Sequence, residues 1–205
     1  MLREFAILSS KNAITEMCDK MTKEEKQSRL NLARERFNEL YPNYPPFDSS
    51  HGTLYQPITI LNKANSRLSN SARIDSFSKL ELGQGAIIGD LVHIASFFHL
   101  IGGGLFIAED GSAFSSGSKI VTGSNIPGYD RGCSAVDPNA IISRGFVWCK
   151  EKSFVATGAI VLPGCIIGVG SVVGAGSVVL SHTDIPDWEI WGGNPARFIK
   201  RLEKE

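Results

Sequence analysis

An apolar residue at every sixth position is the feature that most restricts how this chain can fold. The repeat occupies two blocks: Leu82, Ile88, Ile94 and Leu100, and then Cys149, Val155, Val161, Ile167, Val173 and Val179. A spacing of six fits neither the period of an α-helix nor simple strand alternation. Six residues can instead form one side of a triangular coil, with three sides to a turn. The spacing therefore predicts a parallel β-helix with these aliphatics pointing inward.

Small residues accompany the aliphatics, as a narrow prism requires. The positions two residues earlier are mostly small: Val147, Ser153, Ala159, Cys165, Ser171 and Ser177. The stretch 158–181 combines such residues with glycine and carries no charge. Glycine relieves steric conflict at corners that need unusual backbone angles. Because Cys149 and Cys165 follow the repeat and no CxxC pair occurs, we expect reduced cysteines used for packing.

Neither the charge balance nor the N-terminal segment suggests a nucleic-acid partner or a targeting signal. The chain has 21 Lys and Arg against 21 Asp and Glu, so its net charge is zero. This balance gives no reason to expect a nucleic-acid partner. The N-terminal segment has only a short apolar run, interrupted by Arg3 and Glu4, which is a poor signal peptide and too short for a membrane span. We therefore expect a cytoplasmic protein.

The sequence divides into three parts. Residues 1–50 are predicted to be an N-terminal helical arm, in which Thr22 and Glu25 form a capping box. A loose apolar stripe on this arm contains Leu30, Leu32, Ala33 and Phe37. Residues 51–187 are predicted to be the β-helix, with a loop excursion near 123–146 that is a natural place for function. Residues 188–205 are predicted to be a tail that ends in a short helix.

The last part of the sequence carries a family resemblance. "GSVVGAGSVVLSHTDIPDWEIWGGNPARFIKRL" resembles the ending of the hexapeptide-repeat acyltransferases, in which "IGAGSVVTKDIP" is followed by "AGNPAKxIK". The resemblance covers residues 67–203 and implies a mainly β, left-handed parallel β-helix. "VHIASFFHLIGGGLFI" and "SGSKIVTGSNIPG" are similar to segments of the maltose/galactoside and sugar-nucleotide acetyltransferases. The resemblance implies a homotrimer that uses acetyl-CoA to modify a sugar in surface-polysaccharide, including lipopolysaccharide, biosynthesis.

The resemblance also implies where acetyl-CoA binds. Small residues of the C-terminal coils would line the pantetheine groove, while residues of the tail would contact the nucleotide. The implied set is Ala156, Gly158, Gly174, Ala175, Trp191, Asn194, Arg197 and Lys200. Trp191 would stack on adenine or, alternatively, pack the tail against the prism. The basic residues would meet phosphates or form a solvated face. The tail departs from the family at "VVLSHTDIP", which is two residues longer and places His182 and Thr183 in this region.

The catalytic histidine of the maltose/galactoside group is missing from the matching stretch "SKIVTGSN", where Asn125 stands. Asn125 can orient a substrate but cannot accept its proton, so His99 is our first candidate for a catalytic base. We expect substrate contacts from His93, Tyr129 and Asp130. An amine is partly neutral near pH 7 and needs no strong base. This favours N-acetylation of a nucleotide-linked amino sugar; the alternative is O-acetylation of a sugar hydroxyl with His99 as base.

Three other classes fit less well. The γ-class carbonic anhydrases bind zinc through a His-x4-His pair and a third His, whereas this chain has His93 and His99 with five residues between them. We therefore expect no metal site. A purely structural scaffold has no use for the "GGNPAR" ending. Xenobiotic acetyltransferases share the ending but rely on a histidine that is absent here.

Overall fold

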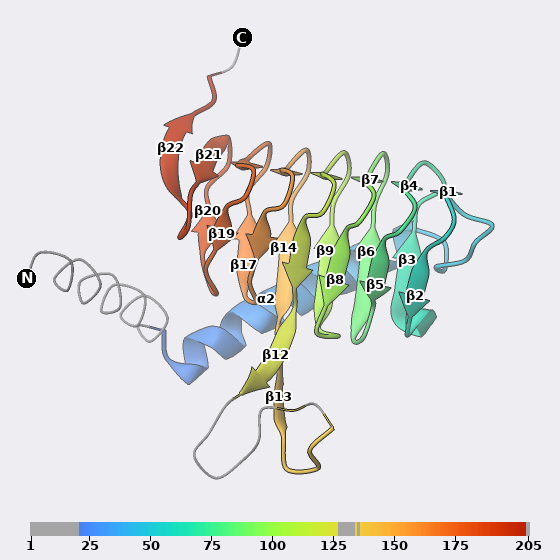
Figure 1. The fold of residues 1–205 in the computed structure, drawn as a ribbon, viewed down its shortest axis with the longest axis horizontal. Helices are drawn as coiled ribbons and strands as arrows, with labels where there is room; N and C mark the ends of the chain where they lie inside the picture. Colours follow the sequence, from blue (N-terminus) through green and yellow to red (C-terminus); the bar gives the residue numbers. More distant parts are fainter. Residues whose placement is uncertain (1–20, 127–133, 135, 204–205) are drawn as a thin grey trace, which may run out of the picture.

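Three parallel sheets form the sides of a triangular prism (Figure 1). The structure is a computed structural model and describes residues 21–126, 134 and 136–203. Strands that are hydrogen-bonded neighbours come from successive turns of the chain, as in β3, β6 and β9. The parallel β-helix predicted from the six-residue spacing is therefore confirmed. We call the three sides sheets A, B and C.

Each complete turn of the chain contributes one strand to each sheet, and β21 and β22 extend sheet B at the C-terminal end. Sheet A contains β3 (Ser66–Leu68), β6 (Gly85–Ile88), β9 (Leu105–Ala108), β14 (Phe146–Cys149), β17 (Cys165–Ile167) and β20 (Asp184–Ile185). Sheet B contains β1 (Thr53–Leu54), β4 (Arg73–Ile74), β7 (His93–Ile94), β10 (Ala113–Phe114), β15 (Phe154–Val155), β18 (Val172–Val173), β21 (Glu189–Gly192) and β22 (Arg197–Arg201). Sheet C contains β2 (Thr59–Leu61), β5 (Lys79–Glu81), β8 (His99–Ile101), β11 (Lys119–Val121), β16 (Ile160–Val161) and β19 (Val178–Val179).

The predicted inward residues fill the prism. All ten members of the two apolar blocks are buried, and each is at most 1% exposed. The small companions Ser153, Ala159, Cys165, Ser171 and Ser177 are buried beside them. Stacking one aliphatic on another along the axis removes a continuous column of apolar surface from water, which is the main favourable term in folding.

The turns are not all built from three hexads. In the last turns, paired residues are 18 apart in sequence, as in Phe154 and Val172. In the first turns they are 20 apart, as in Lys79 and His99. The two additional residues lie at the corner between sheets C and A, around Gly83 and Gly103. The expectation of 18 residues for every turn is therefore wrong at the N-terminal end, where this corner is wider.

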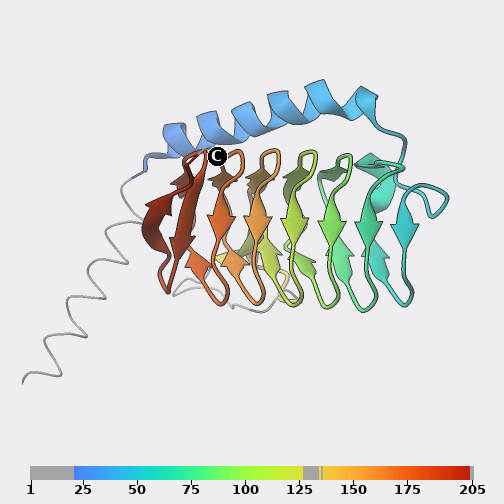
Figure 2. The same cartoon turned by 90° about the horizontal axis from the view of Figure 1, so that it is seen from above.

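The helix α2 (Lys23–Leu40) lies along sheet A and runs the length of the prism (Figure 2). It begins near the last turns, where Arg29 binds Asp184, and ends near the first, where the Arg67 side chain contacts Tyr41. Midway, the Arg36 Nε donates to Oε1 of buried Glu109 at 2.7 Å. The helix therefore covers one of the three faces.

The predicted capping box is present at the start of α2. The Glu25 amide donates to Thr22 Oγ1 at 3.1 Å, and the Thr22 amide donates to Glu25 Oε2 at 2.6 Å. Ala33 is fully buried, and Leu30 and Phe37 pack against sheet A with it. The prediction that Leu32 belongs to the apolar stripe is wrong, because the Leu32 side chain is 48% exposed. A short 3-10 helix, η1 (Tyr41–Asn43), follows α2.

The loop excursion leaves the prism between sheets C and A. Its base is an antiparallel pair formed by β12 (Gly123–Ile126) and β13 (Ile141–Arg144). The pair projects away from the prism in Figure 1. Another 3-10 helix, η2 (Lys63–Asn65), lies at the same corner in the first turn. None of the helices in the described ranges has the length and apolarity needed to cross a membrane.

The tail is a strand rather than the predicted short C-terminal helix. Strand β22 pairs antiparallel with β21, with Gly192 opposite Arg197 and Trp191 opposite Phe198. The small Ala196 is buried against the end of the core. This pairing satisfies the backbone groups of β21, which no further turn would cover.

Candidate functional site

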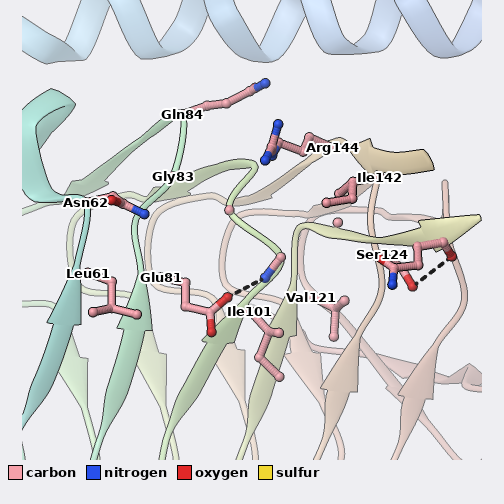
Figure 3. A pocket seen from close by; sticks show the side chains of 14 residues that line it. Leu61, Asn62, Glu81, Gly83, Gln84, Ile101, Val121, Ser124, Ile142 and Arg144 are labelled. Carbon is pink, nitrogen blue, oxygen red and sulfur yellow. Dashed lines mark hydrogen bonds between the residues drawn. The ribbon is translucent and has the colours of Figure 1, made fainter. Parts of the chain in front are cut away.

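The widened corner between sheets C and A contains a cavity of about 700 Å³ (Figure 3). Its walls come from four successive turns and from the base of the loop excursion. The lining residues are Leu61, Asn62, Glu81, Gly83, Gln84, Ile101, Gly102, Gly103, Val121, Gly123, Ser124, Asn125, Ile142 and Arg144. The combination of apolar walls with a few polar groups is typical of a small-molecule site.

Glycine backbone forms the wall of this cavity at the corner. A Cβ on Gly83 would lie 1.9 Å from the carbonyl oxygen of Gly103, and one on Gly102 would lie 2.3 Å from that of Gly123. The φ of Gly102 is 97°, a conformation that residues with a side chain rarely adopt. Glycine is therefore required for the turns to approach each other here.

Glu81 is the negative group of the cavity. Its carboxylate accepts from Lys79 Nζ at 2.8 Å and from the Gly102 amide at 3.1 Å. These hydrogen bonds, the one from Lys79 first, hold the pKa of Glu81 below its ordinary value. A carboxylate held ionised at the cavity wall can attract a cationic group of a ligand.

Arg144 is the positive group. It lies at the end of β13, and its side chain extends across the cavity toward Gln84 (Figure 3). Asn125 lines the same cavity from β12, which is a position suited to orienting a substrate. Its role in catalysis stays a prediction.

The two histidines of the repeats point outward from different sheets. The Nε2 of His93 lies 3.0 Å from Asp75 Oδ2 on sheet B. Burial alone would raise the pKa of Asp75, but hydrogen bonds from Arg73 and His93 lower it. His99 lies on sheet C between Lys79 and Lys119 of the neighbouring strands. His99 does not line the cavity that contains Asn125, although Ile101 of the same strand does. Both roles stay predictions.

The predicted coenzyme groove follows the corner between sheets B and C in the last turns. Gly158 and Gly176 have φ of 67° and 65°, and a Cβ on either would meet no atom within 4 Å. The nearby Ala156 and Gly174 are half-buried, and Ala175 is exposed. This corner is smooth and open, which suits close approach of a ligand to the backbone.

Of the four tail residues predicted to contact the coenzyme, one is packed against the core and three are exposed. Trp191 pairs with Val173 and packs against the end of the core, while its Nε1 donates to Glu189 Oε2 at 2.8 Å. This supports the packing alternative over adenine stacking. Asn194, Arg197 and Lys200 are exposed, as binding to phosphates requires.

Sequence reasoning missed Glu81 and Arg144. A signal for Glu81 was available, because Leu61, Glu81, Ile101 and Val121 are spaced by 20 and face the same cavity. The predicted substrate contacts Tyr129 and Asp130 lie outside the described residues. Within the described ranges, no group of three or more His, Cys, Asp and Glu residues could hold a metal ion.

Comparison with curated proteins gives only a short match, and no protein-family model matches the chain. A stretch of 56 residues is 41% identical to gamma carbonic anhydrase 1, mitochondrial, and 34% identical to gamma carbonic anhydrase 2, mitochondrial, both from Arabidopsis thaliana. The stretch covers 27% of this chain and 20% of each relative.

Solved structures match over most of the chain. AntD, an N-acyltransferase from Bacillus cereus in complex with dTDP and 3-hydroxybutyryl-CoA, is 25% identical with a TM-score of 0.68, over 83% of this chain and 88% of that one. A variant of AntD in complex with dTDP-4-amino-4,6-dideoxyglucose and coenzyme A is 26% identical with a TM-score of 0.66, over 74% and 80%. A hexapeptide-repeat acetyltransferase from Vibrio cholerae, complexed with acetyl-CoA, shares the fold at 19% identity and a TM-score of 0.51, over 91% and 93%. The predicted left-handed parallel β-helix of the hexapeptide-repeat acyltransferases is thereby confirmed.

Proposed function

We propose that this β-helix protein of the hexapeptide-repeat type transfers an acyl group from acyl-CoA to the amino group of a nucleotide-linked sugar. The observation that carries the proposal is the match to AntD, an N-acyltransferase, over more than four fifths of both chains. A variant of that protein was crystallised with an amino-sugar nucleotide together with coenzyme A. Both substrates are therefore assigned to this chain by similarity of fold and sequence.

Acyl transfer to an amine does not need a strong catalytic base. The neutral amine attacks the thioester carbonyl, a tetrahedral oxyanion forms, and the C–S bond breaks to release the coenzyme thiol. The proton lost by the amine passes to the leaving thiolate, directly or through water. Positioning the amine against the thioester and stabilising the oxyanion are then the main tasks of the protein.

The cavity at the corner of sheets C and A suits the sugar. The carboxylate of Glu81 attracts the ammonium form of the acceptor, and the amide of Asn125 can hydrogen-bond to sugar hydroxyls. Ile101 and Val121 supply apolar surface for the sugar ring. His99, on the outer face of sheet C, remains our candidate base for the proton that the ammonium form loses before the neutral amine attacks.

The proposal also includes the oligomeric state of the protein, its cell compartment and the use of its product. The chain acts as a homotrimer, as the family resemblance implies; sheets B and C, which α2 does not cover, leave surface for the other subunits. It acts in the cytoplasm, where acyl-CoA is available, and its product enters surface-polysaccharide synthesis, including that of lipopolysaccharide. It needs no nucleic-acid partner.

The test is release of coenzyme thiol from acetyl-CoA and from 3-hydroxybutyryl-CoA. The acceptors are dTDP-linked amino sugars and the corresponding dTDP sugars with a hydroxyl in place of the amine. Wild type is compared with His99→Ala and Asn125→Ala. We expect turnover of an amino sugar, a loss of less than about tenfold for His99→Ala, and a larger loss in kcat/KM for Asn125→Ala.

Each other outcome has a defined meaning. Turnover of the hydroxyl acceptors alone, with a loss of about a hundredfold or more on removing His99, would establish O-acylation instead. Absence of thiol release with every acceptor, in a protein that binds acyl-CoA, would reject the amino-sugar assignment. Failure to bind any acyl-CoA would reject the transferase itself.

A further inference from the structure

A second, basic groove lies beside the cavity, between the first turns of α2 and the corner of sheets C and A. Its volume is about 340 Å³. Its lining includes Lys23, Lys26 and Arg144, together with His182, Gly164 and apolar or small residues. Three of these side chains are cations, and none of the described residues that line the groove is acidic. In a chain of zero net charge, this is a local excess of positive charge.

Among the described residues, Lys23, Lys26 and Arg144 form no ion pair with a carboxylate. The carboxylate of Asp184 instead binds Arg29, whose Nη2 also donates to the carbonyl of Gly164 at 2.8 Å. Arg29 and Asp184 therefore largely offset each other's charge, and the excess positive charge of the groove comes from Lys23, Lys26 and Arg144. The pKa of His182 is lowered, first by burial and then by the charges of Lys26 and Arg29, which reflects the same positive potential.

Arg144 belongs to both spaces. It lines the cavity that contains Glu81 and Asn125, and it also lines the basic groove. A ligand that extends past Arg144 would therefore meet one carboxylate and amides at one end, and three cations at the other. An amino-sugar nucleotide has this distribution of charge, with an ammonium on the sugar and two negative phosphates next to it.

We propose that the basic groove formed by Lys23, Lys26 and Arg144 binds the diphosphate of the nucleotide-linked acceptor. The inference deepens the proposed function and rests on it for the identity of the acceptor. The lysines act as point charges on phosphate oxygens, and the planar guanidinium of Arg144 can bind two oxygens at once. The helix α2 thereby contributes to the acceptor site as well as covering sheet A.

The test measures binding of three probes to the full chain by calorimetry: inorganic pyrophosphate, dTDP and coenzyme A. The variants are Lys23→Gln/Lys26→Gln and Arg144→Gln. The control is Arg34→Gln, an exposed cation of the same helix that lines neither space. Circular dichroism and thermal unfolding establish that each variant is folded.

We expect each site variant to weaken dTDP and pyrophosphate binding by tenfold or more, with coenzyme A binding changed less than twofold and the control unchanged. Weaker coenzyme A binding with unchanged dTDP binding would assign the groove to the coenzyme and overturn the inference. Unchanged binding of all probes, or no binding of dTDP to wild type, would overturn it as well.

Turnover separates this inference from the proposed function. If the dTDP amino sugar is acylated, the site variants should raise its KM tenfold or more and leave the KM for acyl-CoA unchanged. Normal KM values in the variants would reject the groove and retain the function. Loss of dTDP binding in the variants of a protein that acylates no amino sugar would retain the groove and reject the function.

Discussion

Two cysteine side chains are part of the stacked interior. Cys149 and Cys165 are both fully buried, and Cys165 Sγ donates to the Leu180 carbonyl at 3.0 Å. Burial raises the pKa of both thiols, that of Cys165 to about 12. The thiolate is the reactive form of cysteine. Both thiols are therefore unreactive as long as the β-helix is folded.

We predict that neither thiol reacts in the native protein. In a Cys18→Ser/Cys133→Ser background, Ellman's reagent at pH 8 should modify almost no thiol, since burial keeps both side chains protonated and out of contact with the reagent. Adding guanidinium chloride should release two thiols per chain. Rapid modification of the folded protein would contradict the buried positions.

His182 offers a prediction about pH. Burial, followed by the charges of Lys26 and Arg29, lowers its pKa below the ordinary value. The unfolded chain therefore binds a proton more readily than the folded one, and stability decreases as the pH falls through about 6.5 and below. His182 has a φ of 63°, which Asn tolerates. His182→Asn should lose less free energy of unfolding between pH 7.5 and 5.5 than wild type does.

Urea denaturation at the two pH values measures this difference. The other histidines are present in both proteins, so their contributions cancel in the comparison. An equal loss of stability in wild type and His182→Asn would show that His182 titrates normally in the folded state.

At the scale of elements, α2 is fixed to sheet A by a buried carboxylate. Glu109 Oε1 accepts from Arg36 Nε at 2.7 Å and from Trp148 Nε1 at 2.9 Å, while the Glu109 side chain is 6% exposed. Removing Glu109 would leave the half-buried Trp148 N–H without its acceptor and the 32% exposed Arg36 with Glu39 alone. These hydrogen bonds thus hold α2 at a defined position on sheet A.

We predict that Glu109→Ala lowers the free energy of unfolding by about 2 kcal/mol, through two lost hydrogen bonds to a charged group. The matched control is Glu39→Ala, because Glu39 also binds Arg36, at 3.2 Å, but its side chain is 66% exposed. The control should cost less than about 1 kcal/mol. Urea denaturation followed by circular dichroism measures both. Equal effects of the two substitutions would show that burial of Glu109 does not matter.

The elements differ in how far the sequence predicts them. The buried aliphatics of the prism and the capping box of Thr22 and Glu25 depend on residues a few positions apart. The local sequence pattern was therefore sufficient to predict them. The strand β22 depends on pairing with β21 at an open end of the sheet, which overrides local helix propensity. The cavity joins Glu81 to Arg144 from different turns; the 20-residue spacing indicates Glu81, but no local pattern indicates Arg144, which comes from the base of the loop excursion.

At the scale of the whole molecule, two exposed phenylalanines remain without a role in the single chain. Phe77 and Phe97 lie at the corner of sheets B and C in adjacent turns, and their rings stack at 5.3 Å with planes 8° apart. Both have a φ of 63°, and they are 58% and 62% exposed. Later turns place Gly117 and Gly158 at this corner with positive φ. A bulky residue in this conformation is strained by about 1 kcal/mol or more, so the pair is explained if it packs in the proposed trimer.

This explanation predicts opposite effects of Phe77→Gly/Phe97→Gly on the chain and on its assembly. Glycine relieves the left-handed strain and offsets its own entropic cost, so unfolding of the separated chain should change by less than about 1 kcal/mol. Loss of two aromatic anchors should raise the trimer dissociation constant at least tenfold, because such residues carry much of the energy of an interface. Sedimentation equilibrium measures the constant, and Leu91→Gly, at another exposed positive-φ corner, is the control. A trimer of unchanged affinity in the double variant would place the two rings outside the interface, and a wild-type chain that stays monomeric would reject the trimer itself.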